Sequence, residues 1–94
     1  MKLRWTAPAI RQLHRIYDFI ASEHPAAALR TIQLIRQSLQ RVALMRYSGR
    51  TGRVEGTREI VIPGTAYLAA YRIFKDEVQV LAVQHGAQNW PDVF

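Results

Sequence analysis

The fold is decided by residues 67–84, which read YLAAYRIFKDEVQVLAVQ. In the first part, Tyr67–Phe74, every second residue is apolar or aromatic and would lie on the same face of a strand: Tyr67, Ala69, Tyr71 and Ile73. This period of two predicts a strand. The second part, Val78–Gln84, is apolar on both faces and therefore predicts an interior strand. Only a tight turn around Lys75-Asp76 separates the two parts, so we expect them to pair as an antiparallel hairpin.

Upstream of this hairpin, a third strand is predicted at Thr57–Ile62, where Pro63-Gly64 stops it. Three glycines break up residues 49–56, and we interpret this stretch as a loop. Three consecutive strands with short connections form an antiparallel meander. The second half of the chain is therefore predicted to be a small sheet.

The first half of the chain has mainly helical periodicity. Lys2–Trp5 predicts a short strand, and Thr6 is a suitable N-cap for the next helix, with Pro8 in its first turn. Apolar residues at helical spacing run from Ile10 to Ile20, and a second stripe begins after Pro25 and lasts about 20 residues. The short joint between the two stripes predicts an antiparallel helix hairpin.

The predicted order is β-α-α-β-β-β in a single domain that spans residues 1–94. This order describes an α+β fold, in which the helix hairpin packs on one face of a small, mainly antiparallel sheet. We expect the other face of the sheet to be uncovered and available for function.

Positive charge is concentrated in the first half of the chain. The net charge is +6, and residues 1–48 carry eight Lys and Arg against two acidic residues, whereas residues 49–94 carry five of each sign. Arginine outnumbers lysine eleven to two, and arginine suits bidentate pairing with carboxylate or phosphate. Solubility and surface ion pairs could explain this excess, but its placement favours an acidic partner, either a protein segment or nucleic acid.

The composition excludes several classes of protein. With 94 residues, of which 49% are hydrophobic, the chain suits one domain with one core. The absence of cysteine removes disulfides, thiolate metal sites and cysteine nucleophiles. No apolar run approaches the ~20 residues of a membrane span, and the N-terminus lacks a signal-peptide pattern, so we expect a cytoplasmic protein. The three histidines lack ligand spacing and no phosphate loop is present, so we expect neither metal nor cofactor.

Three side chains are candidates for chemistry. His85 lies just past the last predicted strand, where it could be a general acid or base, or be hydrogen-bonded at the sheet edge. Strict alternation places it on the face of Leu81 and Val83. Arg58 and Arg72 lie among apolar strand residues, so each needs an ion pair within the chain, a phosphate, a partner or an escape to solvent.

Four aromatic residues are also candidates for contact. Tyr47, Tyr67 and Tyr71 could stack on bases or line an interface, or they could be core and rim residues. Trp90 follows the last strand closely, and we expect its segment to fold back and cover an apolar edge.

Three segments carry a resemblance to a known family: residues 49–60 (GRTGRVEGTREI), residues 67–73 (YLAAYRI) and residues 80–91 (VLAVQHGAQNWP). In this order they resemble the RelE/ParE superfamily of toxins from type II toxin–antitoxin modules. The order β-α-α-β-β-β agrees too, so the resemblance covers essentially the whole chain. It implies a small antitoxin partner, one segment of which wraps the toxin.

The superfamily divides into two activities. RelE-like members cut messenger RNA in the ribosome, whereas ParE-like members poison DNA gyrase by protein contact. RelE-like nucleases carry an arginine directly after the first aromatic residue of the strand Tyr67–Phe74, and this chain has Leu68 there. The resemblance therefore favours a non-enzymatic gyrase inhibitor that acts in growth inhibition and plasmid stabilisation. The alternatives are a RelE-like ribosome-dependent endoribonuclease and a non-toxic basic nucleic-acid-binding module.

The resemblance and the charge pattern define three sets of candidate residues. If the chain is a nuclease, His85 would move protons, and Arg58 and Arg72 would clamp phosphate. The residues expected to contact the target, whether gyrase or the ribosome and messenger RNA, are Arg50, Arg53, Arg58, Tyr67, Tyr71, His85 and Trp90. Those expected to face acidic residues of the antitoxin are Arg11, Arg15, Arg30 and Arg41.

Overall fold

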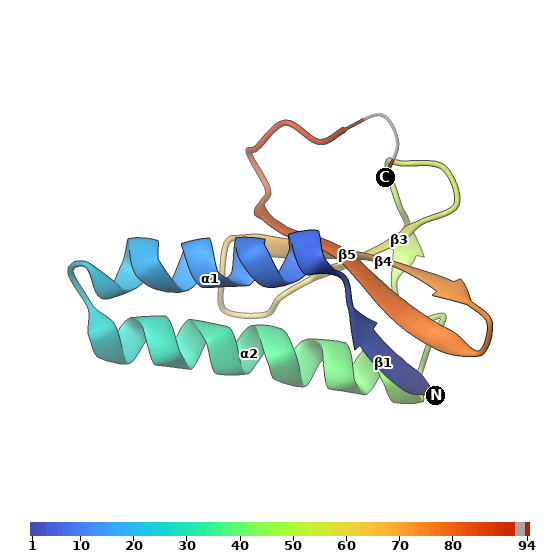
Figure 1. Ribbon diagram of the computed structural model, residues 1–94, viewed down its shortest axis with the longest axis horizontal. Coiled ribbons are helices and arrows are strands. Elements are labelled where there is room, and N and C mark those ends of the chain that lie inside the picture. The colour runs from blue at the N-terminus through green and yellow to red at the C-terminus, as the bar shows by residue number, and fades with distance from the viewer. Residues whose placement is uncertain (92–93) are drawn as a thin grey trace.

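The computed structural model describes residues 1–91 and 94, with two helices on one side of a five-stranded sheet (Figure 1). The elements are β1 (Lys2–Trp5), α1 (Ala7–Ala21), α2 (Pro25–Leu44), β2 (Arg50–Thr51), β3 (Arg58–Val61), β4 (Tyr67–Phe74) and β5 (Glu77–His85). The predicted order of two helices between one strand and a three-stranded meander is confirmed. The stretch interpreted as a loop also contains the two-residue strand β2, which pairs with the start of β3.

The sheet order is β1-β5-β4-β3-β2, so β5 is an interior strand, as its apolar residues predicted. It runs parallel to β1 and antiparallel to β4. After β1 ends, Thr6 continues the contact, because its backbone N–H and its hydroxyl both donate to the carbonyl of Val80. Further along, the side-chain Oε1 of Gln12 accepts a hydrogen bond of 2.8 Å from the N–H of Val83. Thr6 and Gln12 therefore supply hydrogen-bond partners for backbone groups of β5 beyond the end of β1.

The pairing of β4 with β5 contains a bulge. Ala70 lies opposite Ala82, but the next residue, Tyr71, lies opposite Val80. Leu81 is thus the extra residue in β5, and an extra residue reverses the alternation of faces beyond it.

The bulge decides which face carries His85. Val83 lies opposite Ala69 and His85 lies opposite Tyr67, so both share the helix-covered face with Val80. The prediction that His85 shares a face with Leu81 is therefore wrong. Strict alternation fails here because the bulge falls between the two positions.

The helices bury their apolar stripes against one face of the sheet. The hydroxyl of Thr6 accepts a hydrogen bond from the N–H of Ala9, and a proline lies in the first turn of each helix. The main core contains Ala9, Ile16, Ile35, Leu39, Ile62, Ala69, Val80 and Val83. A smaller cluster of Val42, Tyr71 and Val78 fills the space beneath the end of α2. In the described part of the chain, no helix is both long enough and apolar enough to cross a membrane.

The other face of the sheet is covered, so the prediction that it would be uncovered is wrong. Ala70 and Ala82 are fully buried there, and Val54, from the loop before β3, is only 3% exposed. Figure 1 shows residues 86–91, the C-terminal segment, turning back from the end of β5 towards the side of this loop. The fold therefore places the loop and the C-terminal segment over the central strands of this face.

Candidate functional site

The arginines of the loop before β3 converge on Glu59, which is 2% exposed. The backbone N–H of Arg53 donates to Glu59 Oε2 at 2.8 Å, and its guanidinium donates to both carboxylate oxygens at 3.1 and 3.2 Å. Arg50 lies opposite Glu59 in the β2–β3 register and adds a longer bond of 3.5 Å. Burial favours the protonated form of Glu59, but the bonds and charge of Arg53, with help from Arg50, hold its pKa below the usual value.

Arg53 also contacts Trp90. Its guanidinium carbon lies 4.5 Å from the centroid of the indole ring, within the range of a cation–π contact. Residues 49–56 and residues 86–91 are thus in contact in the folded chain, although they are far apart in the sequence. We call the unit Glu59–Arg53–Trp90 the clamp. Trp90 folds back as expected, but it lies over the side of the sheet that carries Glu59 and not at an apolar edge.

Arg58 points to the opposite side from Arg53. Its guanidinium donates to the carbonyl of Gly49 at 2.7 Å and to that of Tyr47 at 3.4 Å, and it lies 5.0 Å from the centroid of the Tyr47 ring. Arg58 thus forms no ion pair with another described residue, and its guanidinium is already hydrogen-bonded and not free to bind a phosphate. Arg58 instead fixes the turn between α2 and β2.

Tyr71 was expected to contact a target, but its side chain is fully buried. Its hydroxyl donates to the carbonyl of Arg46 at 2.8 Å and accepts from the N–H of Gly49 at 2.9 Å. A Cβ added at Gly49 would lie 2.5 Å from the hydroxyl oxygen, so the close approach requires glycine there. Tyr71 is therefore an internal anchor for residues 46–49 and offers no contact surface.

Arg72 lies on the Glu59 side of the sheet and belongs to a chain of polar side chains. Its Nε donates to Gln79 at 2.7 Å, Gln79 donates to Glu77 at 2.7 Å, and Arg4 pairs with Glu77 at 3.0 Å. This network holds the β4–β5 hairpin to β1. Arg72 is thus exposed and hydrogen-bonded to the neutral side chain of Gln79, and it forms no ion pair with another described residue, so the ion pair that the sequence suggested is not found.

His85 and Tyr67 lie opposite each other at the far end of the same hairpin. Their rings meet edge to face, with centroids 5.9 Å apart. The Nδ1 atom of His85 accepts a hydrogen bond from the N–H of Ala87 at 3.1 Å. The neutral ring therefore carries its proton on Nε2, and the other nitrogen is occupied.

The three candidate nuclease residues do not converge. Arg72 lies five positions from the Tyr67–His85 pair along β4, or about 16 Å at the usual rise of a strand. It also lies on the other face of the sheet from His85. Arg58 is on the side of His85, but it is turned towards two backbone carbonyls. No single phosphate could contact all three side chains in this arrangement.

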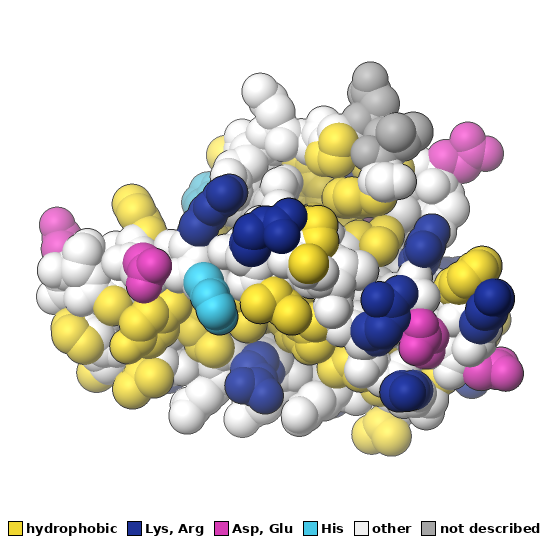
Figure 2. Space-filling model, in the orientation of Figure 1, with side chains coloured by type: hydrophobic (Ala, Val, Ile, Leu, Met, Phe, Trp, Pro, Cys, Tyr) yellow, Lys and Arg dark blue, Asp and Glu magenta, His cyan; other side chains and the backbone are white. Residues whose placement is uncertain are grey.

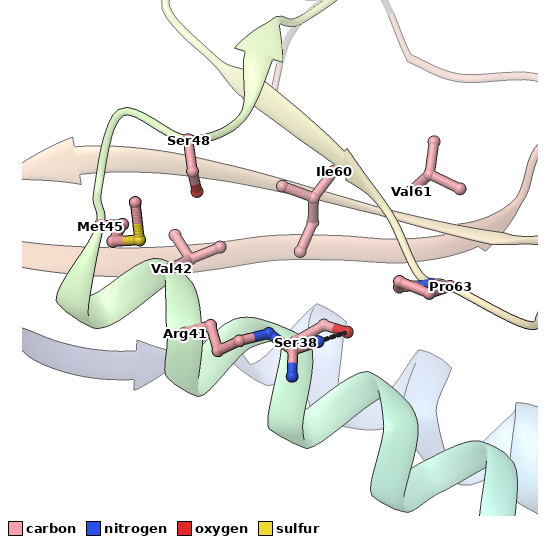
Figure 3. A pocket seen from close by; sticks show the side chains of 8 residues that line it. All are labelled: Ser38, Arg41, Val42, Met45, Ser48, Ile60, Val61 and Pro63. Carbon is pink, nitrogen blue, oxygen red and sulfur yellow. Dashed lines mark hydrogen bonds between the residues drawn. The ribbon is translucent and has the colours of Figure 1, made fainter.

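A groove lies between the end of α2 and the outer edge of β3 (Figure 3). Its volume is about 240 Å³. β4 pairs with one edge of β3 along its whole length, whereas on the outer edge β2 pairs only with Arg58 and Glu59. In the described residues no strand therefore pairs with the outer edge of β3 at Ile60 and Val61. The lining residues are Ser38, Arg41, Val42, Met45, Ser48, Ile60, Val61 and Pro63. Except for Arg41, these residues were not among the sequence candidates, although the exposed apolar Met45 and Val61 could have drawn attention to them.

The four arginines expected to bind an antitoxin do not share one surface. Arg41 lines the α2–β3 groove, whereas Arg15 lines a separate pocket beside Tyr67 and His85. Arg11 and Arg30 are exposed on their helices. Figure 2 shows Lys and Arg side chains in separate groups over α1 and around the start of β1. Hydrophobic side chains lie between the two helices and at the end of the molecule where α1 and α2 are joined. Among the described residues, no three His, Asp or Glu side chains are placed to share a metal ion.

Comparisons with known proteins connect this geometry to one family. The family described as "ParE toxin of type II toxin-antitoxin system, parDE" matches residues 3–90. A Sinorhizobium fredii protein named "Putative toxin Y4kP" is 39% identical over 92 residues, which cover 98% of this chain and 95% of that protein.

Solved structures agree with the family match. A structure titled "Chromosomal ParDE TA system from P. aeruginosa" has a TM-score of 0.82 at 27% identity and covers 90% of this chain and 95% of its own. The RelBE2 toxin–antitoxin complex of Mycobacterium tuberculosis has a TM-score of 0.56 at 26% identity, covering 89% of this chain and 95% of its own. The isolated RelE toxin of E. coli, at 12% identity and a TM-score of 0.65, covers 94% and 86% and shares the fold.

Proposed function

The chain belongs to the family of ParE toxins of type II toxin–antitoxin systems, and on this premise we propose that it inhibits DNA gyrase by protein contact. Inhibition by contact needs an exposed surface and no catalytic set. We further propose that the toxin acts in the cytoplasm and is neutralised there by a cognate antitoxin.

One observation carries the choice of contact over RNA cleavage. His85, Arg58 and Arg72 occupy two faces and two ends of the sheet, and the two arginines are bonded to partners within the chain. Stabilising a phosphoryl transition state requires donors aimed at one developing charge. Leu68, which replaces the nuclease arginine, is 8% exposed and belongs to the buried part of the sheet. These placements support a role without catalysis.

The surface proposed to face gyrase contains three of the residues that were expected to contact the target, Arg50, Arg53 and Trp90. Arg50 and Arg53 retain side-chain exposures of 61% and 40% despite their bonds to Glu59. Trp90 lies beside Arg53 and is partly exposed. Arginine and tryptophan are the residue types most often found at the energetic centres of interfaces.

The α2–β3 groove is proposed as the antitoxin site. It combines apolar walls, a strand edge without a neighbour in the described residues and a cation, Arg41, at its rim. An extended segment could add to the strand edge and place an acidic residue near Arg41. The groove is separate from the Arg53–Trp90 surface, so the two proposed contacts involve different residues.

Purified toxin mixed with gyrase and supercoiled plasmid tests the proposed target. We expect loss of supercoiling activity and accumulation of cleaved plasmid as toxin concentration rises. Full gyrase activity at excess toxin would refute the proposal. A parallel primer-extension assay on messenger RNA from a translating extract tests the RelE-like alternative, because new 5′ ends that disappear in His85→Ala would assign cleavage to this chain.

A further inference from the structure

A second pocket, of about 290 Å³, lies between α1 and the ends of β4 and β5. We call it the α1 pocket. It brings together Arg15, which was expected to meet an antitoxin, with Tyr67 and His85, which were expected to meet the target. The remaining lining residues are Ile16, Phe19 and Gln88. None of the six residues carries a carboxylate.

The polar groups of the α1 pocket are mainly hydrogen-bond donors. Arg15 forms no ion pair with any other residue that the structure describes. The Nδ1 atom of His85 is occupied by the Ala87 N–H, so the neutral ring presents an N–H at Nε2. Burial raises the pKa of Tyr67, which therefore keeps its hydroxyl proton at neutral pH.

Gln88 completes this set of donors. Its Oε1 accepts a hydrogen bond of 2.7 Å from the backbone N–H of His85, which leaves its amide N–H groups as the remaining polar feature. The side chains thus offer one permanent positive charge and up to three neutral donors. A group that accepts several hydrogen bonds and carries one negative charge complements them.

The apolar part of the α1 pocket comes from α1. Ile16 is only 7% exposed and belongs to the core, whereas Phe19 is 78% exposed one turn further along the helix. An aromatic ring left this exposed beside a pocket is a usual anchor point for a partner. The ligand should therefore carry an apolar group next to its charge.

We infer that the α1 pocket receives an acidic side chain of a partner protein, with its carboxylate facing Arg15, Tyr67 and His85 and a neighbouring apolar residue against Phe19. A protein segment is favoured over nucleic acid because the pocket has one arginine, whereas binding to nucleic acid is supported by several phosphate contacts. Arg53 and Arg58, which could have supplied more cations, are bonded elsewhere. The inference concerns ligand chemistry and does not depend on gyrase being the target.

A titration of the whole chain followed by NMR tests this inference. The probes are the peptide acetyl-Leu-Asp-Leu-amide, its Asn counterpart and adenosine monophosphate, and the signals are those of the His85 ring and the Gln88 side-chain amide. We expect saturable shifts with the Asp peptide and binding weaker by on the order of tenfold with the Asn peptide, since a charge-assisted bond is lost. Equal binding of the two peptides, or tighter binding of the nucleotide, would overturn the inference.

Variants locate the site. Arg15→Gln should weaken binding of the Asp peptide by on the order of tenfold, and Tyr67→Phe by a smaller factor. Arg30→Gln is the matched control, because Arg30 is an exposed arginine on the other helix and does not line the α1 pocket. Backbone spectra of all variants report whether the fold is intact. Unchanged affinity in a folded Arg15→Gln variant would place the binding elsewhere.

Discussion

The guanidinium of Arg53 lies over the indole ring of Trp90, 4.5 Å from its centroid, and the same guanidinium is bonded to both carboxylate oxygens of Glu59. Arg53 therefore links the buried carboxylate of Glu59 to Trp90 in the C-terminal segment. Two motifs that sequence comparison treats as separate form one structural unit, the clamp. The surface proposed to face gyrase depends on this unit, because it sets where Trp90 lies.

Replacement of Arg53 by Gln should release Trp90 from the clamp. The loss of charge-assisted bonds to Glu59 should lower the free energy of unfolding by about 2 kcal/mol. In a Trp5→Phe background Trp90 is the only tryptophan, and its fluorescence should become easier to quench with acrylamide. Arg50→Gln is the control, because Arg50 binds the same carboxylate, whereas the cation–π contact with the indole is made by Arg53. Equal quenching in both variants would show that Arg53 does not hold Trp90.

Stability should fall in acid through Glu59. Its pKa is lowered in the folded protein, so between the folded value and the unfolded value of about 4.3 the unfolded chain binds more protons. The contribution of Glu59 is therefore fully present above the unfolded pKa and is lost as the pH falls through the folded pKa. Urea unfolding at several pH values between 7 and 2 should show a shallower acid dependence for Glu59→Gln than for the wild type. Parallel curves would assign the acid sensitivity to other carboxylates.

Removal of the hydroxyl of Tyr71 should destabilise the chain without changing its surface. Tyr71→Phe leaves the N–H of Gly49 and the carbonyl of Arg46 without their partner, which should cost about 1–3 kcal/mol. Tyr47→Phe is the control, because Tyr47 is 63% exposed and should change the free energy of unfolding by less than about 0.5 kcal/mol. A denaturant titration measures both, and similar values for the two variants would contradict an anchoring role.

The order of elements could be predicted from the sequence because each element has its own periodicity and boundary. Thr6, Pro8 and Pro25 mark the helix starts, and the alternation in Tyr67–Phe74 marks the central strand. These signals depend only on the residues of each element, so they can be recognised without knowing which other elements pack against it.

The candidate site was predictable only in part, because its geometry depends on contacts that are distant in sequence. The extra residue Leu81 changes the face of His85, and nothing in an apolar run indicates where a bulge falls. The sequence left Tyr71 as either a contact residue or a core residue, because an aromatic at strand spacing suits either face. Arg53 was expected to contact a target because the sequence does not show that Glu59, in the next strand, folds against its guanidinium.

Charge reversal at Arg41 separates the α2–β3 groove from the general basic charge of the helices. Arg41 lines this groove, whereas Arg30 is exposed near the other end of the same helix, so both reversals change the net charge equally. Arg41→Glu should weaken binding of the cognate antitoxin by on the order of tenfold or more, chiefly through faster dissociation, if an acidic residue lies near it. Arg30→Glu should act mainly through long-range attraction and lose its effect at high salt. Calorimetry at two salt concentrations distinguishes these outcomes, and equal, salt-sensitive losses in the two variants would remove the α2–β3 groove as the antitoxin site.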